Sequence, residues 1–415
     1  MLTNVTVEEA REIIQGLVIP LQPESISLVD SLQRITALDI VAPGDLPPCP
    51  RSAMDGFVIH NSNLKGACEL LVNDNLSPGT IPASILKPGE TVKVATGGIL
   101  PAGSAAVIPE ENAVCKGNYL FFKKEIDPGA NIKPQGEDFK EGDLILRRNT
   151  CLNPGALGVL AAFGQQKVRV YRRPAVAIIC LGQEIIPYHL EPQKGQVRDS
   201  NGLLLTSLVL QDGGQVAGLE YVGLSTRDSF MDTLEGLFQK ADLVITIGGA
   251  ANGEYDQALS ILRKAGVKIV FWGMQAKPGS HCGGGFRKSK PVIALSGNPS
   301  ACVVGYHLLA SPVLRKMQGL SSGQDRIMAV CVDNYQKKGN ARRFLWGQMF
   351  LDIDTWKVKI LPGQKSSMLK SLLCYNSLID LPAGYPPFEK GSVVPVIRVP
   401  GTSLAHLSTY QGPKT

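Results

Sequence analysis

Apolar residues recur at helical spacing near both ends of the first 170 residues. Between Thr6 and Val18 they fall on one face, and Thr6 with Glu9 has the spacing of a capping box, so we predict a helix there. A second helical pattern covers 152–163 and is expected to pair with the first. Between them, after the proline-rich stretch 43–50, short apolar runs alternate with Gly and Pro, which predicts a β-rich insertion.

From residue 173 onward, continuous apolar runs alternate with helical patterns. Buried strands are expected at 174–182, 215–222, 243–247, 267–272 and 291–295. Helices are expected near 200–211, 228–240, 256–265 and 299–318. This alternation is typical of a doubly wound α/β domain, whose ligand site lies at the carboxyl ends of the strands. After Ser321 the chain returns to short strands separated by Gly and Pro turns, which predicts a second β module.

The patterns divide the chain into four modules, as expected for 415 residues. The predicted fold class is multidomain α/β. Its parts are a helical linker and dimerisation module (1–45 with 145–172), a β-rich insertion (46–144), a doubly wound α/β domain (173–320) and a C-terminal β-barrel-like module (321–405).

Composition narrows the class of partner. The chain is 44% hydrophobic and 19% charged, with a net charge of +6 and no long basic run, which argues against nucleic acid and suits a small polyanionic ligand. The nine cysteines form no C-x-x-C pair, so we expect a reduced, cytoplasmic protein. The start is acidic and amphipathic, unlike a signal peptide, and no apolar run reaches the roughly 18 residues of a membrane span.

The most distinctive local feature is a glycine-rich turn after the run 243–247. It reads Thr246-Ile-Gly-Gly-Ala-Ala-Asn-Gly-Glu-Tyr-Asp256. Glycines let backbone N–H groups approach a phosphate, although a tight turn with Asp256 as a helix cap fits equally. Two further turns, Gly182–Glu184 and Ser296–Ser300, are expected at the same sheet edge. Together they predict a pocket for a phosphorylated ligand.

The predicted insertion contains acidic residues at Asp55, at Glu110 and Glu111, and at Glu137 and Asp138. Such loop carboxylates are either solvated turn residues or oxygen ligands for a hard cation such as Mg²⁺. No Ser/His/Asp or Cys/His arrangement is visible. Residue spacing alone therefore predicts a phosphate-binding α/β domain with acidic loops.

Eight short motifs, in one order along the chain, resemble those of the MoeA family, which includes the E domain of gephyrin. They are Arg51-Ser-Ala-Met-Asp-Gly-Phe57, Ala95-Thr-Gly-Gly98 with Ala106-Val-Ile108, Gly136-Glu-Asp138, Gly182-Gln-Glu184, Asp199-Ser-Asn201, Gly248-Gly249 with Gly253 and Asp256, Lys277-Pro-Gly279 and Gly297-Asn-Pro299. Each motif is weak alone, but eight in order are specific.

The resemblance implies a molybdopterin molybdenumtransferase, which inserts molybdate or tungstate into adenylylated molybdopterin and releases AMP. It implies a molybdopterin-binding-like α/β domain and a homodimer whose cleft lies between this domain and the partner's insertion. Mg²⁺ or another divalent cation is the implied cofactor, and other cofactor-biosynthesis proteins are implied partners. The implied catalytic and metal-binding carboxylates are Asp55, Asp138, Glu184 and Asp256. The implied substrate-binding residues are Thr96, Gly248, Gly249, Gly253, Lys277, Asn298, Pro299 and Ser366.

The chain departs from the family's pattern around the oxyanion. Gly273 and Ser280 stand where the family has lysine, Ser296 where it has proline, and Trp346 where it has arginine. Nearby cations that can substitute are Arg287, Arg342, Arg343 and Lys365. We therefore expect weakened oxyanion binding.

Two alternatives to the transferase stay open at this point. One is a catalytically reduced paralogue that binds pterin or acts as a scaffold. The other is a nucleotide-dependent hydrolase. The sequence does not distinguish molybdenum from tungsten, nor does it identify the divalent ion.

Overall fold

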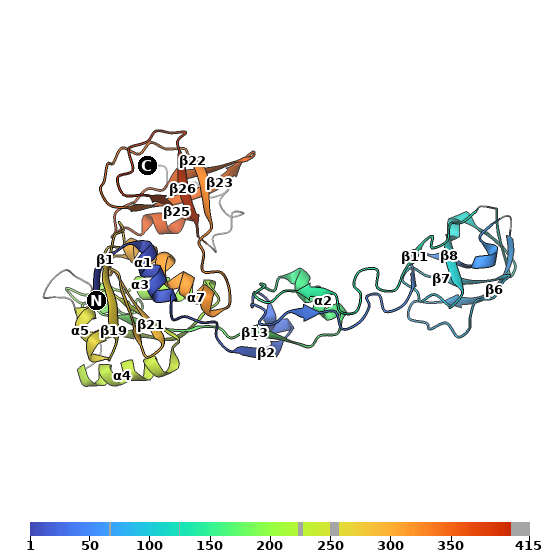
Figure 1. The fold of residues 1–415 in the computed structure, drawn as a ribbon, viewed down its shortest axis with the longest axis horizontal. Coiled ribbons are helices and arrows are strands. Elements are labelled where there is room, and N and C mark those ends of the chain that lie inside the picture. Colours follow the sequence, from blue (N-terminus) through green and yellow to red (C-terminus); the bar gives the residue numbers. More distant parts are fainter. Residues whose placement is uncertain (66–67, 124, 223–226, 250–256, 400–415) are drawn as a thin grey trace. The chain divides into compact units, whose positions relative to one another are not determined.

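The computed structural model describes residues 1–65, 68–123, 125–222, 227–249 and 257–399. The chain forms two compact units (Figure 1). Unit 1 comprises 1–25, 33–37 and the chain from 169 onward, and unit 2 comprises 26–32 and 38–168. Within the described residues, no helix is long and apolar enough to cross a membrane.

A seven-stranded sheet forms the centre of unit 1, in the order β1-β19-β20-β21-β18-β14-β17. The strands are β1 (Leu2–Val5), β14 (Ala175–Cys180), β17 (Gln215–Tyr221), β18 (Leu243–Ile247), β19 (Lys268–Met274), β20 (Gly283–Arg287) and β21 (Lys290–Leu295). All neighbours are parallel except β20, which is antiparallel to both β19 and β21. The five strands predicted from apolar runs are all present.

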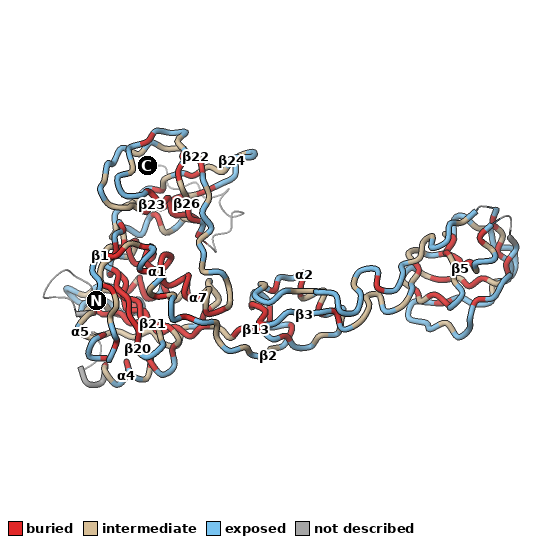
Figure 2. Tube along the Cα trace, viewed as in Figure 1, coloured by how far each residue is buried: buried red, intermediate tan, exposed pale blue. Residues whose placement is uncertain are grey.

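Helices cover both faces of this sheet. They are α1 (Val7–Gln15), α3 (Asn201–Gln211), α4 (Arg227–Lys240), α5 (Gln257–Lys264), and α6 (Pro299–Gly305), η5 (Tyr306–Ala310) and α7 (Ser311–Met317). Alternate residues of β14 face opposite layers: Ile178 packs in the cluster that contains Leu205 of α3 and Val304 of α6, and Ile179 in the cluster with Leu234 of α4. Buried residues accordingly follow the strands (Figure 2). The doubly wound α/β fold is confirmed.

Strand β20 was not predicted, because its three consecutive glycines are typical of a loop. In the structure they are required by the neighbouring strand β19. A Cβ atom on Gly283 would lie 2.1 Å from the Trp272 ring, and one on Gly285 would lie 2.4 Å from the Lys268 carbonyl oxygen. Strand β20 therefore has no side chains where the Trp272 ring and the Lys268 backbone of β19 lie against it.

The first helix begins at the predicted capping box. Thr6 Oγ1 accepts from the Glu9 N–H at 3.2 Å, and the Glu9 carboxylate accepts from the Thr6 N–H at 2.8 Å. The expected pairing of this helix with 152–163 is wrong. Helix α1 packs on β19 and α7 in unit 1, whereas α2 (Pro154–Ala162) belongs to unit 2. Since β1 places Leu2–Val5 beside β19, the start of the chain is part of the α/β domain.

The C-terminal part of unit 1 is a closed five-stranded barrel, which confirms the predicted β module. Its order is β22-β24-β23-β25-β26, with β22 (Arg326–Cys331), β23 (Arg343–Asp352), β24 (Thr355–Ile360), β25 (Ser377–Leu381) and β26 (Val393–Arg398). Val358, Ile379 and Val396 fill its interior. A short pair, β15 (Ile185–Ile186) with β16 (Val197–Arg198), lies between β14 and α3 in the chain.

Unit 2 is built around a six-stranded sheet in the order β8-β5-β7-β6-β10-β9. Its strands are β5 (Gly56–His60), β6 (Cys68–Leu76), β7 (Glu90–Val94), β8 (Ser104–Pro109), β9 (Val114–Lys116) and β10 (Tyr119–Phe122). Short pairs join β2 (Pro23–Ser27) to β13 (Lys167–Tyr171), β3 (Ile40–Val41) to β12 (Leu144–Leu146), and β4 (Arg51–Ser52) to β11 (Ile132–Lys133). Along β5, Phe57 and Ile59 face one apolar cluster and Val58 faces another, so both faces of this strand are covered.

Candidate functional site

A cavity of about 540 Å³ lies where three parallel strands of unit 1 end. Strand register explains the convergence, because Cys180 of β14 pairs with Ile247 of β18, and Ile247 with Leu295 of β21. The turns that follow therefore emerge at one level. We call this the sheet-edge cavity; its lining includes Gly182, Glu184, Asp199, Asn201, Gly248, Gly249, His281, Ser296, Gly297, Asn298 and Pro299. The predicted meeting of the three turns is confirmed.

Glycine is required at this edge. Gly248 and Gly249 have φ values of 79° and 65°, in the left-handed region. A Cβ atom on Gly297 would lie only 3.3 Å from the Gly248 Cα. The two turns thus touch backbone to backbone, which leaves their peptide groups at the cavity surface.

The start of α3 contributes polar groups to the same cavity. Asp199 is 5% exposed, and its two oxygens accept from the Gly202 N–H at 2.8 Å and from the Tyr221 hydroxyl at 3.0 Å. This carboxylate is therefore committed to the fold. Asn201 donates from Nδ2 to the Gly297 carbonyl at 2.7 Å, while its buried Oδ1 has no hydrogen-bond partner among the described residues. Burial, with the nearby charge of Asp199, raises the pKa of the Cys180 thiol, which stays protonated.

A second cavity, of about 260 Å³, lies between the α/β domain and the barrel of unit 1. We call it the junction cavity; its polar lining is Lys277, Ser280, His281, Ser296, Asn298, Arg343, Gln364 and Ser366. Two of these side chains are cationic and none is a carboxylate. The lining segments are tied together, because the Lys277 N–H donates to the Arg342 carbonyl at 2.9 Å and the Ser300 N–H to the Ser366 carbonyl at 2.9 Å. His281, Ser296 and Asn298 also line the sheet-edge cavity, so the two cavities adjoin.

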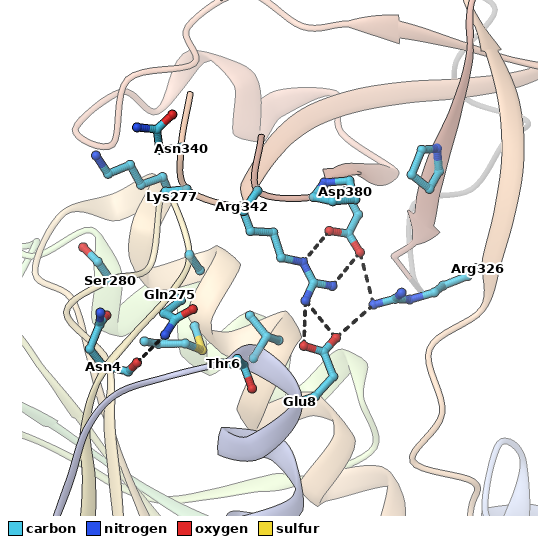
Figure 3. A pocket seen from close by; sticks show the side chains of 17 residues that line it. Asn4, Thr6, Glu8, Gln275, Lys277, Ser280, Arg326, Asn340, Arg342 and Asp380 are labelled. Atoms are coloured by element: carbon cyan, nitrogen blue, oxygen red, sulfur yellow. Dashed lines mark hydrogen bonds and ion pairs between the residues drawn. The ribbon is translucent and has the colours of Figure 1, made fainter. Parts of the chain in front are cut away.

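A third cavity, of about 790 Å³, shares Lys277 and Ser280 with the junction cavity (Figure 3). We call it the outer cavity. One wall is an ion network in which Arg342 donates to Asp380 at 2.7 and 2.8 Å and to Glu8 at 2.8 Å, and Arg326 lies 3.1 Å from Asp380. The hydrogen bonds to Asp380 raise the pKa of Arg342 further. Arg342 is thus committed to holding α1 against the barrel.

In unit 2, the structure brings two predicted residues together. Asp55 is exposed, and its Oδ1 accepts from both the N–H and the hydroxyl of Thr96, at 2.6 and 2.9 Å. These two bonds, the backbone one first, lower the pKa of the Asp55 carboxyl. Asp138 is also exposed, in a turn whose N–H donates to the Leu46 carbonyl at 3.0 Å. Asp55 is therefore ionised and oriented in its loop.

Family models of the MoeA N-terminal region (domain I and II), a probable molybdopterin binding domain and the MoeA C-terminal region (domain IV) match residues 5–164, 177–316 and 328–399. A molybdopterin molybdenumtransferase of Staphylococcus epidermidis is 30% identical over 408 residues, 97% of each chain. The chain belongs to the MoeA family. A Staphylococcus aureus protein of the same name is 30% identical over 379 residues, 90% of each chain.

The solved structure of a molybdopterin biosynthesis MoeA protein from Pyrococcus horikoshii has a TM-score of 0.83 and 26% identity. The match covers 96% of this chain and 100% of that one. The family expected from the eight motifs is confirmed, as is the multidomain fold.

The residues that depart from the MoeA pattern lie in different surroundings. Trp346 is 1% exposed and packs in the core, with its ring 4.5 Å from that of Tyr375. It does not line the junction cavity. Gly273 has a φ of 88°, and a Cβ there would lie 3.4 Å from the Asn4 backbone nitrogen. Of these three positions only Ser280 lines the junction cavity. The expected weakening of oxyanion binding stays a prediction.

The proposed substitute cations also separate. Arg343 lines the junction cavity, whereas Arg342 is held in the ion network. Arg287 pairs with Glu235 and stacks on Phe238. Of the four proposed substitutes, only Arg343 lines the junction cavity.

The implied metal ligands do not form a site within the described residues. No three His, Cys, Asp or Glu side chains in the described ranges lie close enough together to hold a metal ion. At the sheet-edge cavity Glu184 is exposed, but Asp199 has both oxygens engaged. Asp256 and Gly253 lie outside the described residues. One exposed carboxylate does not by itself make a Mg²⁺ site.

Proposed function

We propose that the protein is a molybdopterin molybdenumtransferase, which inserts molybdate or tungstate into adenylylated molybdopterin with release of AMP. The observation that carries the proposal is the shared wall of the sheet-edge and junction cavities, made by His281, Ser296 and Asn298. Such a wall lets a pterin dithiolene in one cavity meet an oxyanion in the other.

The sheet-edge cavity suits the pterin and its adenylate. Backbone N–H groups at glycine turns and at the start of α6 favour phosphate oxygens. Asn298 precedes α6 and makes no side-chain capping bond, so its amide is available to a ligand. The unpartnered Oδ1 of Asn201 is an acceptor for an amino or ring N–H group of the kind that a pterin carries.

The junction cavity suits a tetrahedral dianion. Lys277 and Arg343 supply two positive charges, and Ser280 and Ser366 supply hydroxyl donors. Charge-assisted hydrogen bonds of this kind contribute roughly 1.5–3 kcal/mol each. The cavity's volume of about 260 Å³ is large enough for a small tetrahedral anion.

The proposed insertion balances without a redox partner. Two Mo–S bonds form and one Mo–O bond breaks, and the two thiol protons leave with the released oxide as water. Water also cleaves the phosphoanhydride, which releases AMP. The role of this chain is to hold both reactants across the shared wall and to offset their negative charge.

We propose that Asp55, Asp138 and Asp256 act with Glu184 in adenylate cleavage, within a homodimer in which the insertion of one subunit completes the other's cleft. A divalent cation such as Mg²⁺ would then bind to ligands drawn from both subunits and from the substrate phosphates. The cytoplasmic location expected from the cysteines stays a prediction.

The direct test is an assay with adenylylated molybdopterin and molybdate, in which AMP and molybdenum-loaded cofactor are measured in parallel. We expect both products in equal amounts from the unmodified protein. Lys277→Ala should reduce both at limiting molybdate, whereas Lys264→Ala, a change of an exposed lysine on α5, should reduce neither. AMP without metal insertion, or neither product, would contradict the proposal.

The second candidate is a catalytically reduced paralogue that binds pterin or acts as a scaffold. It is favoured by Ser280, which leaves the junction cavity without one lysine of the family pattern. Tight pterin binding with no metal insertion at any molybdate concentration would support this candidate instead.

A further inference from the structure

His281 is the one ionisable side chain, within the described residues, that lines both the junction cavity and the sheet-edge cavity. The other polar residues common to the two linings, Ser296 and Asn298, are neutral. His281 is exposed rather than packed in the core. Its imidazole is therefore accessible to ligands from both sides.

The backbone fixes this position. His281 follows the turn between β19 and β20, where the Met274 N–H donates to the Ser280 carbonyl at 3.0 Å and the Gly273 N–H to the Cys282 carbonyl at 2.9 Å. These bonds bracket the residue on both sides. Its Nδ1 lies 3.3 Å from Ser280 Oγ, so the histidine and the serine that stands in place of a family lysine form a pair.

The charges around His281 are few. On the junction side they are Lys277 and Arg343. On the sheet-edge side they are Glu184, Arg198 and the committed carboxylate of Asp199, together with the protonated thiol of Cys180. On the junction side His281 therefore has two cationic neighbours and no carboxylate.

We propose that His281 binds the oxyanion in the junction cavity through a ring N–H. This inference rests on the proposed function, because it assumes that an oxyanion occupies this cavity. The ring supplies a donor beside Ser280, which stands where the family pattern has lysine. A hydrogen bond from a ring N–H to an anion is charge-assisted, because the acceptor carries the charge.

The test is equilibrium dialysis of the full-length protein against molybdate at one fixed pH. His281→Ala should bind molybdate about tenfold more weakly than the unmodified protein, the effect of one charge-assisted contact. His281→Lys replaces the donor and should keep tight binding. The matched control is His189→Ala, a change of an exposed histidine of the same unit that lines neither cavity, which should leave affinity unchanged.

Circular dichroism on each variant checks that the fold is intact. Unchanged affinity in His281→Ala, or no molybdate binding by the unmodified protein, would overturn the assignment. Failure of the proposed function is distinguishable, because dialysis requires no turnover. Binding that depends on His281 in a protein that releases no AMP would count against the transferase activity alone.

Discussion

The indole N–H of Trp346 donates a hydrogen bond of 2.6 Å to Ser300 Oγ, joining the first strand of the barrel hairpin to the start of α6. Both groups are buried. The Trp346 backbone is in turn held by Gln364, which accepts from its N–H and donates to its carbonyl, both at 3.0 Å. Gln364 lines the junction cavity and Trp346 does not. Trp346 therefore affects that cavity through the two hydrogen bonds that position Gln364.

We predict that Trp346→Arg destabilises the protein, because it places an unpaired charge in a packed core. The loss of unfolding free energy should be about 3–5 kcal/mol or more, measured by urea denaturation. Trp346→Phe keeps the ring and removes only the N–H, so it should cost about 1–3 kcal/mol. A stable Trp346→Arg protein with tighter oxyanion binding would show that the side chain can turn into the junction cavity.

A cation at position 280, unlike one at 346, should strengthen oxyanion binding, because Ser280 lines the junction cavity. Ser280→Lys places a third permanent charge at the junction cavity, and we expect molybdate affinity to rise about tenfold. Ser289→Lys adds the same charge in the exposed turn between β20 and β21, outside the described cavities, and should leave affinity unchanged. Dialysis at one fixed pH compares the two. A similar gain in both variants would mean that net charge, not position, sets the affinity.

Asp55 is predicted to act in chemistry and not in stability. Its side chain is exposed and accepts hydrogen bonds from exposed Thr96 of a neighbouring loop, so Asp55→Ala should lower the melting temperature only slightly and abolish AMP release. Mixed dimers of Asp55→Ala and Asp256→Ala chains should regain one working site of two. If both parent variants are inactive and the mixture stays inactive, each site is built within one subunit.

The ion network around Arg342 predicts an acid-sensitive link between α1 and the barrel. Burial opposes ionisation of Glu8, but its hydrogen bond to Arg342 and the charges of Arg342 and Arg326 hold its pKa below the usual value. A carboxyl with a lowered pKa stabilises the fold when ionised, and that contribution is lost as the pH falls through the lowered pKa.

Glu8→Gln should therefore lower the melting temperature at neutral pH. The difference from the unmodified protein should shrink as the pH falls below the ordinary glutamate value of 4.5 and vanish below the lowered pKa of Glu8. Glu12→Gln, an exposed change on the same helix, is the control and should have no effect at either pH. A deficit in Glu8→Gln that persists in acid would point to lost packing.

The sequence predicted the parts of the fold that have a strong local signal. Continuous apolar runs identified the parallel strands, and their common carboxyl edge correctly brought Glu184, Gly248 and Asn298 to one cavity. Strand β20 was not predicted because its glycines are required by contacts with β19, and such contacts between strands cannot be read from a local sequence pattern. A motif position identifies Trp346 but not the direction of its side chain, which is buried in the core and does not line the junction cavity.

The segment Lys277–His281 forms part of the wall of all three cavities. A ligand that orients His281 from the sheet-edge side changes the donor that the junction cavity presents. Occupancy of one cavity is therefore coupled to affinity in the other, and thermodynamic linkage requires the coupling to be reciprocal. Bound pterin should alter the dissociation constant for oxyanion by the same factor by which oxyanion alters that for pterin.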